Sequence, residues 1–432
     1  MVPIRNLSDL TSAELGRLFS RFGEDFTTVM IDTVIPIVND VRKNGDGAVK
    51  EYTAKFDGVR LDSIIATPDE IEAGRRNTPP GLTGAFLEAK RNIEEFHRLQ
   101  AREDIRLERG DGAVLGMLYR PIESAAVYVP GGKASYPSSV LMGVIPARLA
   151  GVERITLITP PDKNGRLPDI IGAVCAMTGV DTVIKSGGAQ GIAAAGYGTE
   201  SVQKSEIIVG PGNIYVTAAK TYLFSLGAVQ IDSLAGPSEV LVIADGRANP
   251  RWVAWDLLSQ AEHEEQALAI LLTTSRDLAE AVREEIDRDL KSGSGRHEMK
   301  SASINKNGLI LLVDDIDEAI DFSNRFGPEH MELMVEHPME YLGRIRNVGS
   351  LFLGDYAPVA VGDYFSGTNH ILPTGGAARF SSGTSVETFM RRTTYQLLSR
   401  QALAKARGPV SEMSRVEGFE DKHGGSVNVR FE

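Results

Sequence analysis

Two side chains in one short segment could bind a metal ion. In Leu258-Ser-Gln-Ala-Glu-His263, Gln260 and His263 are three residues apart, so both project from one face of the helix that we expect over Pro250–Glu264. An imidazole nitrogen and an amide oxygen are suitable ligands for zinc. The alternative is a histidine on a solvated helix face, although the neighbouring glutamates already supply solubility there.

An adjacent acid and base form a second candidate site. Pro328-Glu329-His330 follows a predicted helix, Ile316–Phe326. An imidazole titrates near neutral pH, and beside a carboxylate it is suited to proton transfer. A pair on the surface is the ordinary explanation of such a dipeptide, so this motif counts only together with others.

More acid and imidazole groups lie in a glycine-rich segment. Gly362-Asp363-Tyr364 and Gly367-Thr-Asn-His370 lead into residues 371–376, which carry hardly any charge. Such a loop needs tertiary packing to be ordered, and an active-site loop has that packing. His423 lies near the end of the chain, where a segment frays unless it is docked.

Three glycine turns predict a ligand site at one edge of a sheet. Gly210-Pro-Gly-Asn213 follows a predicted strand, and Gly187-Gly-Ala-Gln190 and Tyr128-Val-Pro-Gly-Gly132 follow two others. Turns of this kind direct backbone N–H groups at an anion. Tyr215 replaces the third glycine of the full dinucleotide fingerprint, so one turn alone is equally consistent with a plain tight turn. Three turns at the carboxyl ends of parallel strands favour a binding site.

These motifs lie between short apolar strands that alternate with helices, a pattern typical of a parallel α/β sheet. The predicted strands are Ala113–Leu118, Ala125–Val129, Ile155–Ile158, Thr182–Ile184, Glu206–Val209, Val240–Ala244, Leu268–Leu272, Leu309–Val313 and Ser350–Leu353. The first hundred residues are predicted to be helical, with a helix over Thr27–Arg42 that Asn44-Gly-Asp-Gly47 stops. After Ser381 we expect mostly helix and a last strand, Ser426–Arg430.

Composition narrows the class of protein. The 432 residues predict two to four domains, and a net charge of −12 argues against a nucleic-acid-binding protein. Cys175 is the single cysteine, which excludes an intrachain disulfide and an all-thiolate zinc site. The first 25 residues have no apolar run of signal-peptide type, so we expect a cytoplasmic protein. The remaining histidines are predicted to lie on the surface: His97, His297 and His337.

Taken together, the motifs resemble those of the histidinol dehydrogenase family. The similar segments occur in the family's order from about residue 30 to the C-terminus. They are Tyr128-Val-Pro-Gly-Gly, Gly187-Gly-Ala-Gln, Val209-Gly-Pro-Gly-Asn, Ala235-Gly-Pro-Ser-Glu, Leu258-Ser-Gln-Ala-Glu-His, Gly327-Pro-Glu-His, Gly362-Asp-Tyr and Asn369-His-Ile-Leu-Pro-Thr. The family is zinc-dependent and uses two NAD molecules to oxidise an amino alcohol through an aldehyde to a carboxylate.

The resemblance implies a role for each matching residue. Gln260, His263 and Asp363 match zinc ligands, and His423 matches a fourth ligand that comes from the partner subunit of an intertwined homodimer. Glu329 and His330 match the catalytic pair. The residues that match NAD contacts are Tyr128, Gln190 and Asn213. The residues that match substrate contacts are Ser238, His370 and Glu417, besides His330 and the four zinc ligands.

The resemblance also implies the domain organisation. We expect two incomplete Rossmann-like parallel-sheet domains, one inserted in the other. The expected divisions are an N-terminal arm over 1–26, a first domain with the zinc and catalytic residues over 27–127 and 239–382, an inserted NAD-side domain over 128–238, and a helical tail over 383–432 that is exchanged in the dimer.

Two departures from the family pattern leave the substrate open. Val359 stands where the family has a glutamate, and Glu417 precedes His423 by six residues instead of five, so Glu420 could take its place. A sulfonate substrate would have no use for the missing carboxylate. The alternative substrate is therefore another primary alcohol, such as the substrate of the related sulfopropanediol dehydrogenases. The alternative function is that of a non-catalytic relative that binds NAD or metal.

Overall fold

The computed structural model describes residues 2–21, 25–131, 135–234 and 236–432. Gly132 and Ala235 of the predicted glycine motifs, and residues 22–24 of the predicted arm, lie outside these ranges. The chain forms two compact units, which are described separately: a first unit of Met1–Gln100 and Ile122–Phe389, and a second unit of Ala101–Pro121 and Met390–Glu432. Within the described ranges, no helix has the length and apolar character needed to cross a membrane.

One sheet of the first unit has six parallel strands in the order β1-β11-β10-β9-β12-β13. The strands are β1 (Ile4–Asn6), β9 (Glu239–Ala244), β10 (Leu268–Thr273), β11 (Gly308–Leu312), β12 (His330–Met334) and β13 (Ser350–Leu353). The register pairs His330 with Val240. The first residues of β9 and β12 therefore lie side by side, at the amino edge of the sheet.

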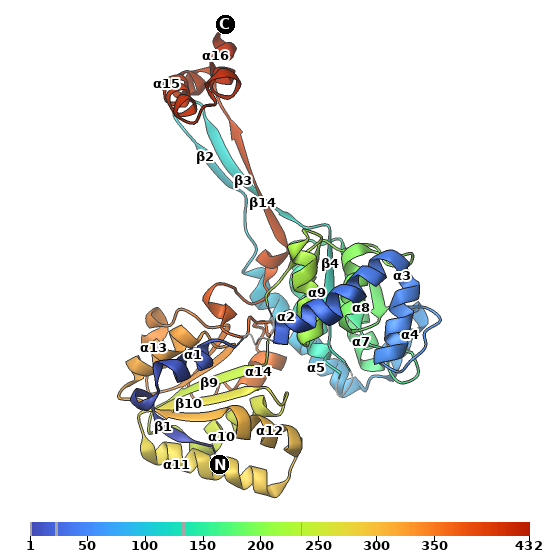
Figure 1. Ribbon diagram of the computed structural model, residues 1–432, viewed down its shortest axis with the longest axis vertical. Coiled ribbons are helices and arrows are strands. Elements are labelled where there is room, and N and C mark those ends of the chain that lie inside the picture. Colours follow the sequence, from blue (N-terminus) through green and yellow to red (C-terminus); the bar gives the residue numbers. More distant parts are fainter. Residues whose placement is uncertain (1, 22–24, 132–134, 235) are drawn as a thin grey trace. The chain divides into compact units, whose positions relative to one another are not determined.

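Helices cover both faces of this sheet (Figure 1). On one face lie α10 (Pro250–Ala261), α11 (Arg276–Ser292) and α12 (His297–Asn307), and on the other α1 (Ser12–Phe19) and α13 (Ile316–Phe326). Amphipathic spacing explains this arrangement: α11 buries Leu278, Val282 and Ile286 at helical intervals and exposes its charges. Two separate apolar layers thus sandwich the sheet.

The second sheet of the first unit has five parallel strands in the order β6-β5-β4-β7-β8. The strands are β4 (Ser124–Tyr128), β5 (Arg154–Thr159), β6 (Thr182–Lys185), β7 (Ile207–Val209) and β8 (Gln230–Ile231). The helices between and beside them are α2 (Asp25–Val29), a π-helical segment Met30–Val34, α3 (Ile35–Phe56), α4 (Pro68–Asn77), α5 (Pro80–Arg98), α6 (Pro137–Ala150), α7 (Asp169–Thr178), α8 (Gly188–Tyr197) and α9 (Ile214–Ser225). Because β1 precedes this sheet and β9 follows it, one α/β layer is inserted in the other, which confirms the predicted fold class.

Helix α3 differs from its prediction in length and in place. It does not stop at Asn44–Gly47: Gly45 kinks it at φ 52°, ψ −135°, and the helix continues to Phe56. Glycine suits that position because a residue with a side chain rarely adopts this positive φ, and the missing Cβ leaves room for the Glu200 carboxylate. Val38 and Val49 of α3 share a core with Ala126 of β4, so this segment packs on the five-stranded sheet, whereas we had assigned it to the zinc-side domain.

The second unit contains an antiparallel sheet, β14-β3-β2. Its elements are β2 (Ile105–Glu108), β3 (Val114–Pro121), β14 (Met390–Leu397), α15 (Arg400–Val416), a π-helical turn Glu420–Gly424, α16 (Gly425–Asn428) and a 3₁₀ turn Val429–Phe431. The predicted strand Ser426–Arg430 is wrong, because those residues are helical. The expectation of a mostly helical tail missed β14, whose polar sequence Met-Arg-Arg-Thr-Thr-Tyr-Gln-Leu has no apolar alternation.

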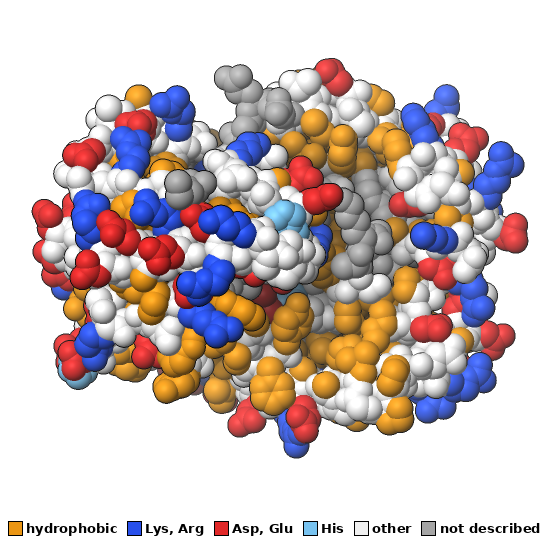
Figure 2. All heavy atoms as spheres, turned by 90° about the horizontal axis from the view of Figure 1, so that it is seen from below, with side chains coloured by type: hydrophobic (Ala, Val, Ile, Leu, Met, Phe, Trp, Pro, Cys, Tyr) orange, Lys and Arg blue, Asp and Glu red, His pale blue; other side chains and the backbone are white. Residues whose placement is uncertain are grey.

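The surface carries charges of both signs. On the face shown in Figure 2, Lys and Arg side chains are interspersed with Asp and Glu side chains. The single cysteine is buried, and burial raises the pKa of the Cys175 thiol to about 12. This thiol is therefore unreactive at neutral pH.

Candidate active site

Seven of the predicted site residues line one cavity of about 300 Å³ in the first unit. They are Asn213, Ser238, His263, Glu329, His330, Asp363 and His370. Asn213 comes from the five-stranded sheet and the other six come from the six-stranded sheet or the loops that leave it. The cavity therefore combines groups from both α/β layers.

The two sheets contribute opposite edges. In the five-stranded sheet, the residues that line the cavity follow the ends of β4 and β7, as predicted from the glycine turns. In the six-stranded sheet, Ser238 precedes β9 and Glu329 precedes β12, and the helix α10 returns the chain to the same edge just before His263. That edge is the amino edge, which the rule for open parallel sheets does not anticipate.

The His330 imidazole is held in one orientation. It is 4% exposed, and its Nδ1 lies 3.0 Å from the backbone oxygen of Glu239. Because a carbonyl oxygen only accepts, Nδ1 carries the proton and Nε2 is the basic nitrogen. Nε2 has no hydrogen-bond partner among the described residues. Burial lowers the pKa of His330, so its neutral, basic form prevails at neutral pH.

The Glu329 carboxyl is also buried beside the cavity. Its Oε2 accepts a hydrogen bond of 2.8 Å from the backbone N–H of Glu239. Burial raises the pKa of Glu329 well above its ordinary value, and the negative charges of Glu239, Asp363 and Glu264 raise it further. A carboxylate with a raised pKa is a stronger base, so Glu329 is suited to taking a proton from water.

Asp363 and His370 are placed by the glycine-rich loop. Asp363 belongs to α14 (Val359–Tyr364), and its Oδ1 lies 3.8 Å from Nε2 of His330. His370 donates through Nδ1 to the backbone oxygen of Asp363 at 2.9 Å, and its Nε2 is 3.2 Å from the hydroxyl of Ser139. Burial lowers the pKa of His370. The loop therefore presents a neutral imidazole and a carboxylate to the same cavity.

His97 contributes to the order of this loop. We had predicted a surface histidine, but His97 is fully buried, and its Nδ1 donates to Ile93 at 2.9 Å. Its Nε2 lies 3.3 Å from Nδ2 of Asn369, which also donates to Met142 at 2.8 Å. The surface prediction is wrong because a histidine on the inner face of α5 can satisfy its polar atoms within the chain.

Gln260 and His263 lie at the end of α10, and the predicted helix through Glu264 is too long. The helix ends at Ala261, and His263 follows in a turn. The backbone N–H of His263 donates to the backbone oxygen of Gln260 at 3.1 Å. Gln260 is 1% exposed, and neither atom of its amide has a hydrogen-bond partner within the described part of the chain. Leaving such a group unpaired costs about 1–3 kcal/mol, so the amide fits a ligand that is not part of the chain.

No group of three or more His, Cys, Asp or Glu side chains is arranged to hold a metal ion within the described ranges. An amide is not one of these types, and one predicted ligand, His423, belongs to the second unit. His423, Glu417 and Glu420 are exposed within that unit. Their predicted roles stay predictions, because the two units are described separately.

A second cavity of about 360 Å³ lies at the carboxyl edge of the five-stranded sheet. It is lined by all three residues predicted to contact NAD, Tyr128, Gln190 and Asn213, together with Gly187 and Gly188. Asn213 also lines the first cavity, so the two cavities are adjacent. Its Oδ1 accepts from the N–H groups of Tyr215 and Val216, at 3.1 and 3.2 Å, and caps α9. The side-chain N–H₂ takes no part in this cap.

Val359, the departure from the family pattern, does not line the catalytic cavity. It is 3% exposed and packs in the apolar core beneath α10 with Phe352. Its backbone N–H donates to Glu332 at 3.0 Å. A side chain in this place contacts protein rather than a ligand, so Val359 gives no reason to prefer a sulfonate substrate.

Two residues that the sequence analysis did not single out contact the predicted catalytic pair. Glu239 contacts both Glu329 and His330 through its backbone, and its buried carboxylate pairs with Arg21 at 2.6 Å. The only signal in the sequence was the position of Glu239 at the end of the motif Ala235-Gly-Pro-Ser-Glu. Arg21 had no signal, because it lies more than 200 residues away in the N-terminal arm.

A buried acid–base pair beside a cavity at the glycine turns of a dinucleotide-type sheet defines an enzyme of the dehydrogenase type. The family model for histidinol dehydrogenase matches residues 21–431. Histidinol dehydrogenase of Leptospira biflexa is 49% identical over 417 residues, which is 96% of each chain. That of Methanothermobacter thermautotrophicus is 46% identical over 390 residues, 90% of this chain and 91% of the relative.

A solved structure agrees with these sequence relatives. The crystal structure of histidinol dehydrogenase from Elizabethkingia anophelis superimposes with a TM-score of 0.92 at 37% identity, covering 99% of this chain and 97% of the other. The chain therefore belongs to the histidinol dehydrogenase family, and the predicted family is confirmed.

Proposed function

We propose that this enzyme oxidises L-histidinol through L-histidinaldehyde to L-histidine, with two NAD⁺ reduced to two NADH and one water consumed, as the last steps of histidine biosynthesis in the cytoplasm. The names of the relatives support the substrate. The observation that carries the chemistry is the shared cavity of His330 and Glu329, two buried groups whose pKa values burial shifts in opposite directions, down for the imidazole and up for the carboxyl.

His330 serves the first oxidation. Its Nε2 takes the hydroxyl proton of the alcohol while the carbon-bound hydrogen leaves as hydride, and its Nδ1–H remains bonded to Glu239. Glu329 serves the second oxidation. It takes a proton from the water that adds to the aldehyde, which yields a hydrate that can lose a second hydride. NAD⁺, which Tyr128, Gln190 and Asn213 are proposed to hold, would supply the hydride acceptor for both oxidations.

Zinc is proposed to be held by Gln260, His263 and Asp363, with His423 of the partner subunit. The donor set of oxygen and nitrogen atoms suits zinc, and the unpaired, buried amide of Gln260 supports an absent ligand. A bound zinc ion would orient the substrate and polarise its oxygen. The NAD contacts are proposed to be Tyr128, Gln190 and Asn213, which line the adjacent cavity.

The homodimer is proposed to complete each site with a tail from its partner. Glu417 and His423 are exposed in the second unit, and Val416 and Phe419 beside them are 85% and 60% exposed. Apolar side chains this exposed are typical of a surface that another chain covers. Glu417, or Glu420 in its place, would meet the cationic groups of histidinol. Ser238 and His370 would contact the substrate from the other side of the cavity.

The test is the NADH yield per molecule of histidinol in the presence of zinc. We expect two NADH for each histidinol consumed, and 2,3-dihydroxypropane-1-sulfonate should give none. A yield of one NADH would contradict the four-electron reaction. Turnover of the sulfonate without turnover of histidinol would instead identify a sulfopropanediol dehydrogenase, and zinc-replete protein inert on every alcohol would identify a non-catalytic relative.

A further inference from the structure

We propose that Arg21 and Glu239 are positioning residues that together set the orientation of both catalytic side chains. The inference rests on the proposed catalytic roles of Glu329 and His330. Neither Arg21 nor Glu239 lies among the residues that line the catalytic cavity, so both would act through the pair and not on the substrate.

Glu239 bonds to the catalytic pair at three points. Its backbone N–H donates to Oε2 of Glu329 at 2.8 Å, and its backbone oxygen accepts from Nδ1 of His330 at 3.0 Å. Its own Oε2 accepts from the backbone N–H of Glu329 at 3.3 Å. A shift of Glu239 would thus move the carboxyl of one catalytic residue and the ring of the other.

The Glu239 carboxylate also ties three separate segments together. Its Oε1 accepts from the backbone N–H of Gly375 at 3.0 Å, in the loop that carries His370. The guanidinium of Arg21 donates to both carboxylate oxygens, from Nε at 2.6 Å and from Nη2 at 3.0 Å. Glu239 is therefore bonded to the N-terminal arm, the start of β12 and the glycine-rich loop at once.

Arg21 is itself held in a single geometry. Nη2 donates to the backbone oxygen of Phe326 at 3.0 Å, Nη1 donates to that of Leu18 at 3.1 Å, and the guanidinium carbon lies 3.6 Å from the centre of the Phe326 ring. Only a planar, forked cation makes these contacts and a bidentate pair together. Without it, Glu239 would be a buried carboxylate with no ion-pair partner among the described residues, and burial favours its neutral form. Protonation of the Glu239 carboxylate would impair either Oε2, which accepts from the N–H of Glu329, or Oε1, which accepts from the N–H of Gly375.

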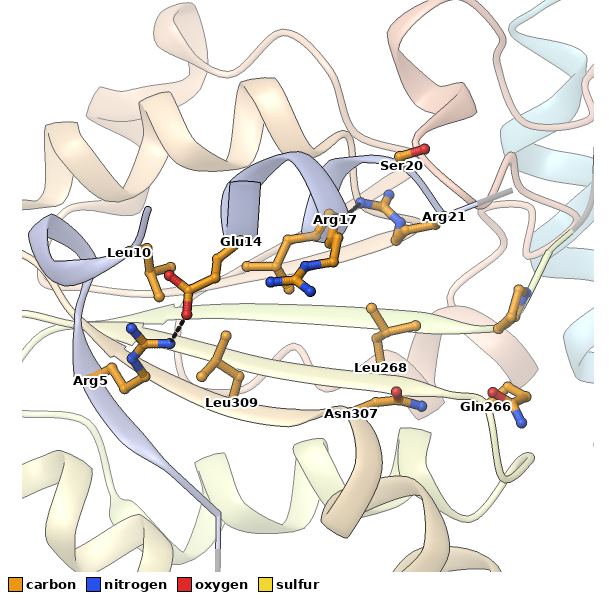
Figure 3. Close-up of a pocket in the computed structure, with 12 residues that line it drawn as sticks. Arg5, Leu10, Glu14, Arg17, Ser20, Arg21, Gln266, Leu268, Asn307 and Leu309 are labelled. Carbon is orange, nitrogen blue, oxygen red and sulfur yellow. Dashed lines mark hydrogen bonds and ion pairs between the residues drawn. The ribbon is translucent and has the colours of Figure 1, made fainter. Parts of the chain in front are cut away.

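A cavity beside Arg21 makes the proposal testable. It has a volume of about 420 Å³ and is lined by Arg17, Ser20, Arg21 and Leu268, among others. Figure 3 shows Arg17 and Arg21 on the N-terminal segment, over the strands that carry Leu268 and Leu309. Arg17 and Ser20 are exposed, so solvent reaches the cavity. A free guanidinium ion could therefore enter the space that Arg21→Ala would leave.

The experiment compares Arg21→Ala with wild-type holoenzyme for histidinol oxidation. We expect kcat to fall about a hundredfold with KM changed less than threefold, because misplacement of catalytic groups by about 1 Å has this effect. Guanidinium chloride at tens of millimolar should raise the kcat of Arg21→Ala at least tenfold. Tetramethylammonium chloride at the same ionic strength should not raise it. Arg17 lines the same cavity, so Arg17→Ala is the matched control, and we expect its kcat to stay within twofold of wild type.

Two outcomes would overturn the proposal: a folded Arg21→Ala variant with kcat within threefold of wild type, or a loss that guanidinium does not reverse at all. If Arg21→Ala does not fold, the Glu239→Gln variant tests the proposal instead.

This variant keeps the side-chain volume but places a donor against the N–H of Glu329. We expect its kcat to fall about tenfold, with an unchanged circular dichroism spectrum and zinc content. Wild-type kcat in a folded Glu239→Gln variant would refute the positioning role.

A second measurement does not depend on turnover. The chain has seven histidines, so ¹⁵N-histidine labelling, with His330→Asn for assignment, resolves the His330 ring. Wild type should show the Nδ1–H tautomer, Arg21→Ala a mixture, and added guanidinium should restore the wild-type signal. An unchanged tautomer in Arg21→Ala would count against the proposal. A wild type that oxidises no histidinol would remove the proposed function, and this spectrum would still decide the inference.

Discussion

Oδ1 of Asp363 lies 3.8 Å from Nε2 of His330, too far for a hydrogen bond, and both atoms face the same cavity. The gap matters because Nε2 is the basic nitrogen of a ring whose other nitrogen is committed to Glu239. An alcohol oxygen bound between these two residues would be within reach of the base, with a carboxylate on its other side to hold a cation.

His330→Ala should therefore lower kcat about a hundredfold or more, the scale of general base catalysis. Because burial lowers the pKa of His330, its basic form persists at pH values below the ordinary imidazole pKa. The acid limb for the first oxidation, the step assigned to His330 and measured in a single turnover, should therefore fall below pH 6.5. His337→Ala, an exposed histidine, is the control and should leave the profile unchanged. An acid limb above pH 7 would contradict the predicted direction.

Gln260→Met should have opposite effects on the stability of the metal-free protein and on zinc binding. The substitution removes a buried amide that has no partner in the described residues, so the metal-free protein should gain about 1–3 kcal/mol of unfolding free energy. Zinc affinity and activity should fall. Chemical denaturation with and without chelator measures both effects. A metal-free variant less stable than the metal-free wild type would show that the amide is satisfied within the chain.

A buried carboxyl, Glu332, and a half-buried one, Asp256, lie away from the first cavity and predict a pH dependence of stability. Burial and the charge of Asp256 raise the pKa of Glu332 well above its ordinary value, and burial raises that of Asp256 to about 6. The folded state thus binds these protons more tightly than the unfolded state, so unfolding free energy should fall as pH rises from about 4 through 6 and beyond.

Glu332→Gln should remove part of this fall. We expect the variant to melt at a higher temperature than wild type at pH 8 and at nearly the same temperature at pH 4, where Glu332 is neutral. The exposed Glu336→Gln is the matched control. If Glu332→Gln lowers the melting temperature at pH 8, then the carboxyl is ionised and paired in the folded state, and the predicted sign is wrong.

Val359→Glu tests whether position 359 meets the substrate. The side chain lies in the apolar core with Phe352, so a carboxyl there should destabilise the protein by several kcal/mol, on the order of 3–5. The ratio of kcat/KM for histidinol and for the hydroxysulfonate should not change. An improved KM for histidinol with little loss of stability would show instead that this position reaches the cavity. Val359→Met, which keeps an apolar side chain, is the control.

Sequence patterns predicted the residues of the site more completely than the contacts between those residues. Local patterns predicted eight of the parallel strands, because buried parallel strands are short apolar runs between turns. They missed β12, whose sequence His-Met-Glu-Leu-Met contains a histidine and a glutamate that are buried in the structure. The contacts of Glu239 with Glu329 and His330 depend on β9 and β12 being neighbours, which no local pattern can show.

The proposed exchange of tails between subunits predicts complementation between two inactive variants. His330→Ala removes the base in the first unit, and His423→Ala removes a proposed ligand in the second unit. If each site takes its tail from the partner, a mixed dimer has one intact site and one doubly altered site.

Refolding the two variants together at equal concentration should give half mixed dimers and about a quarter of wild-type activity. Each variant refolded alone is the control and should stay inactive. No recovery in the mixture, with mixed dimers confirmed by differently tagged chains, would mean that His423 serves the site of its own chain.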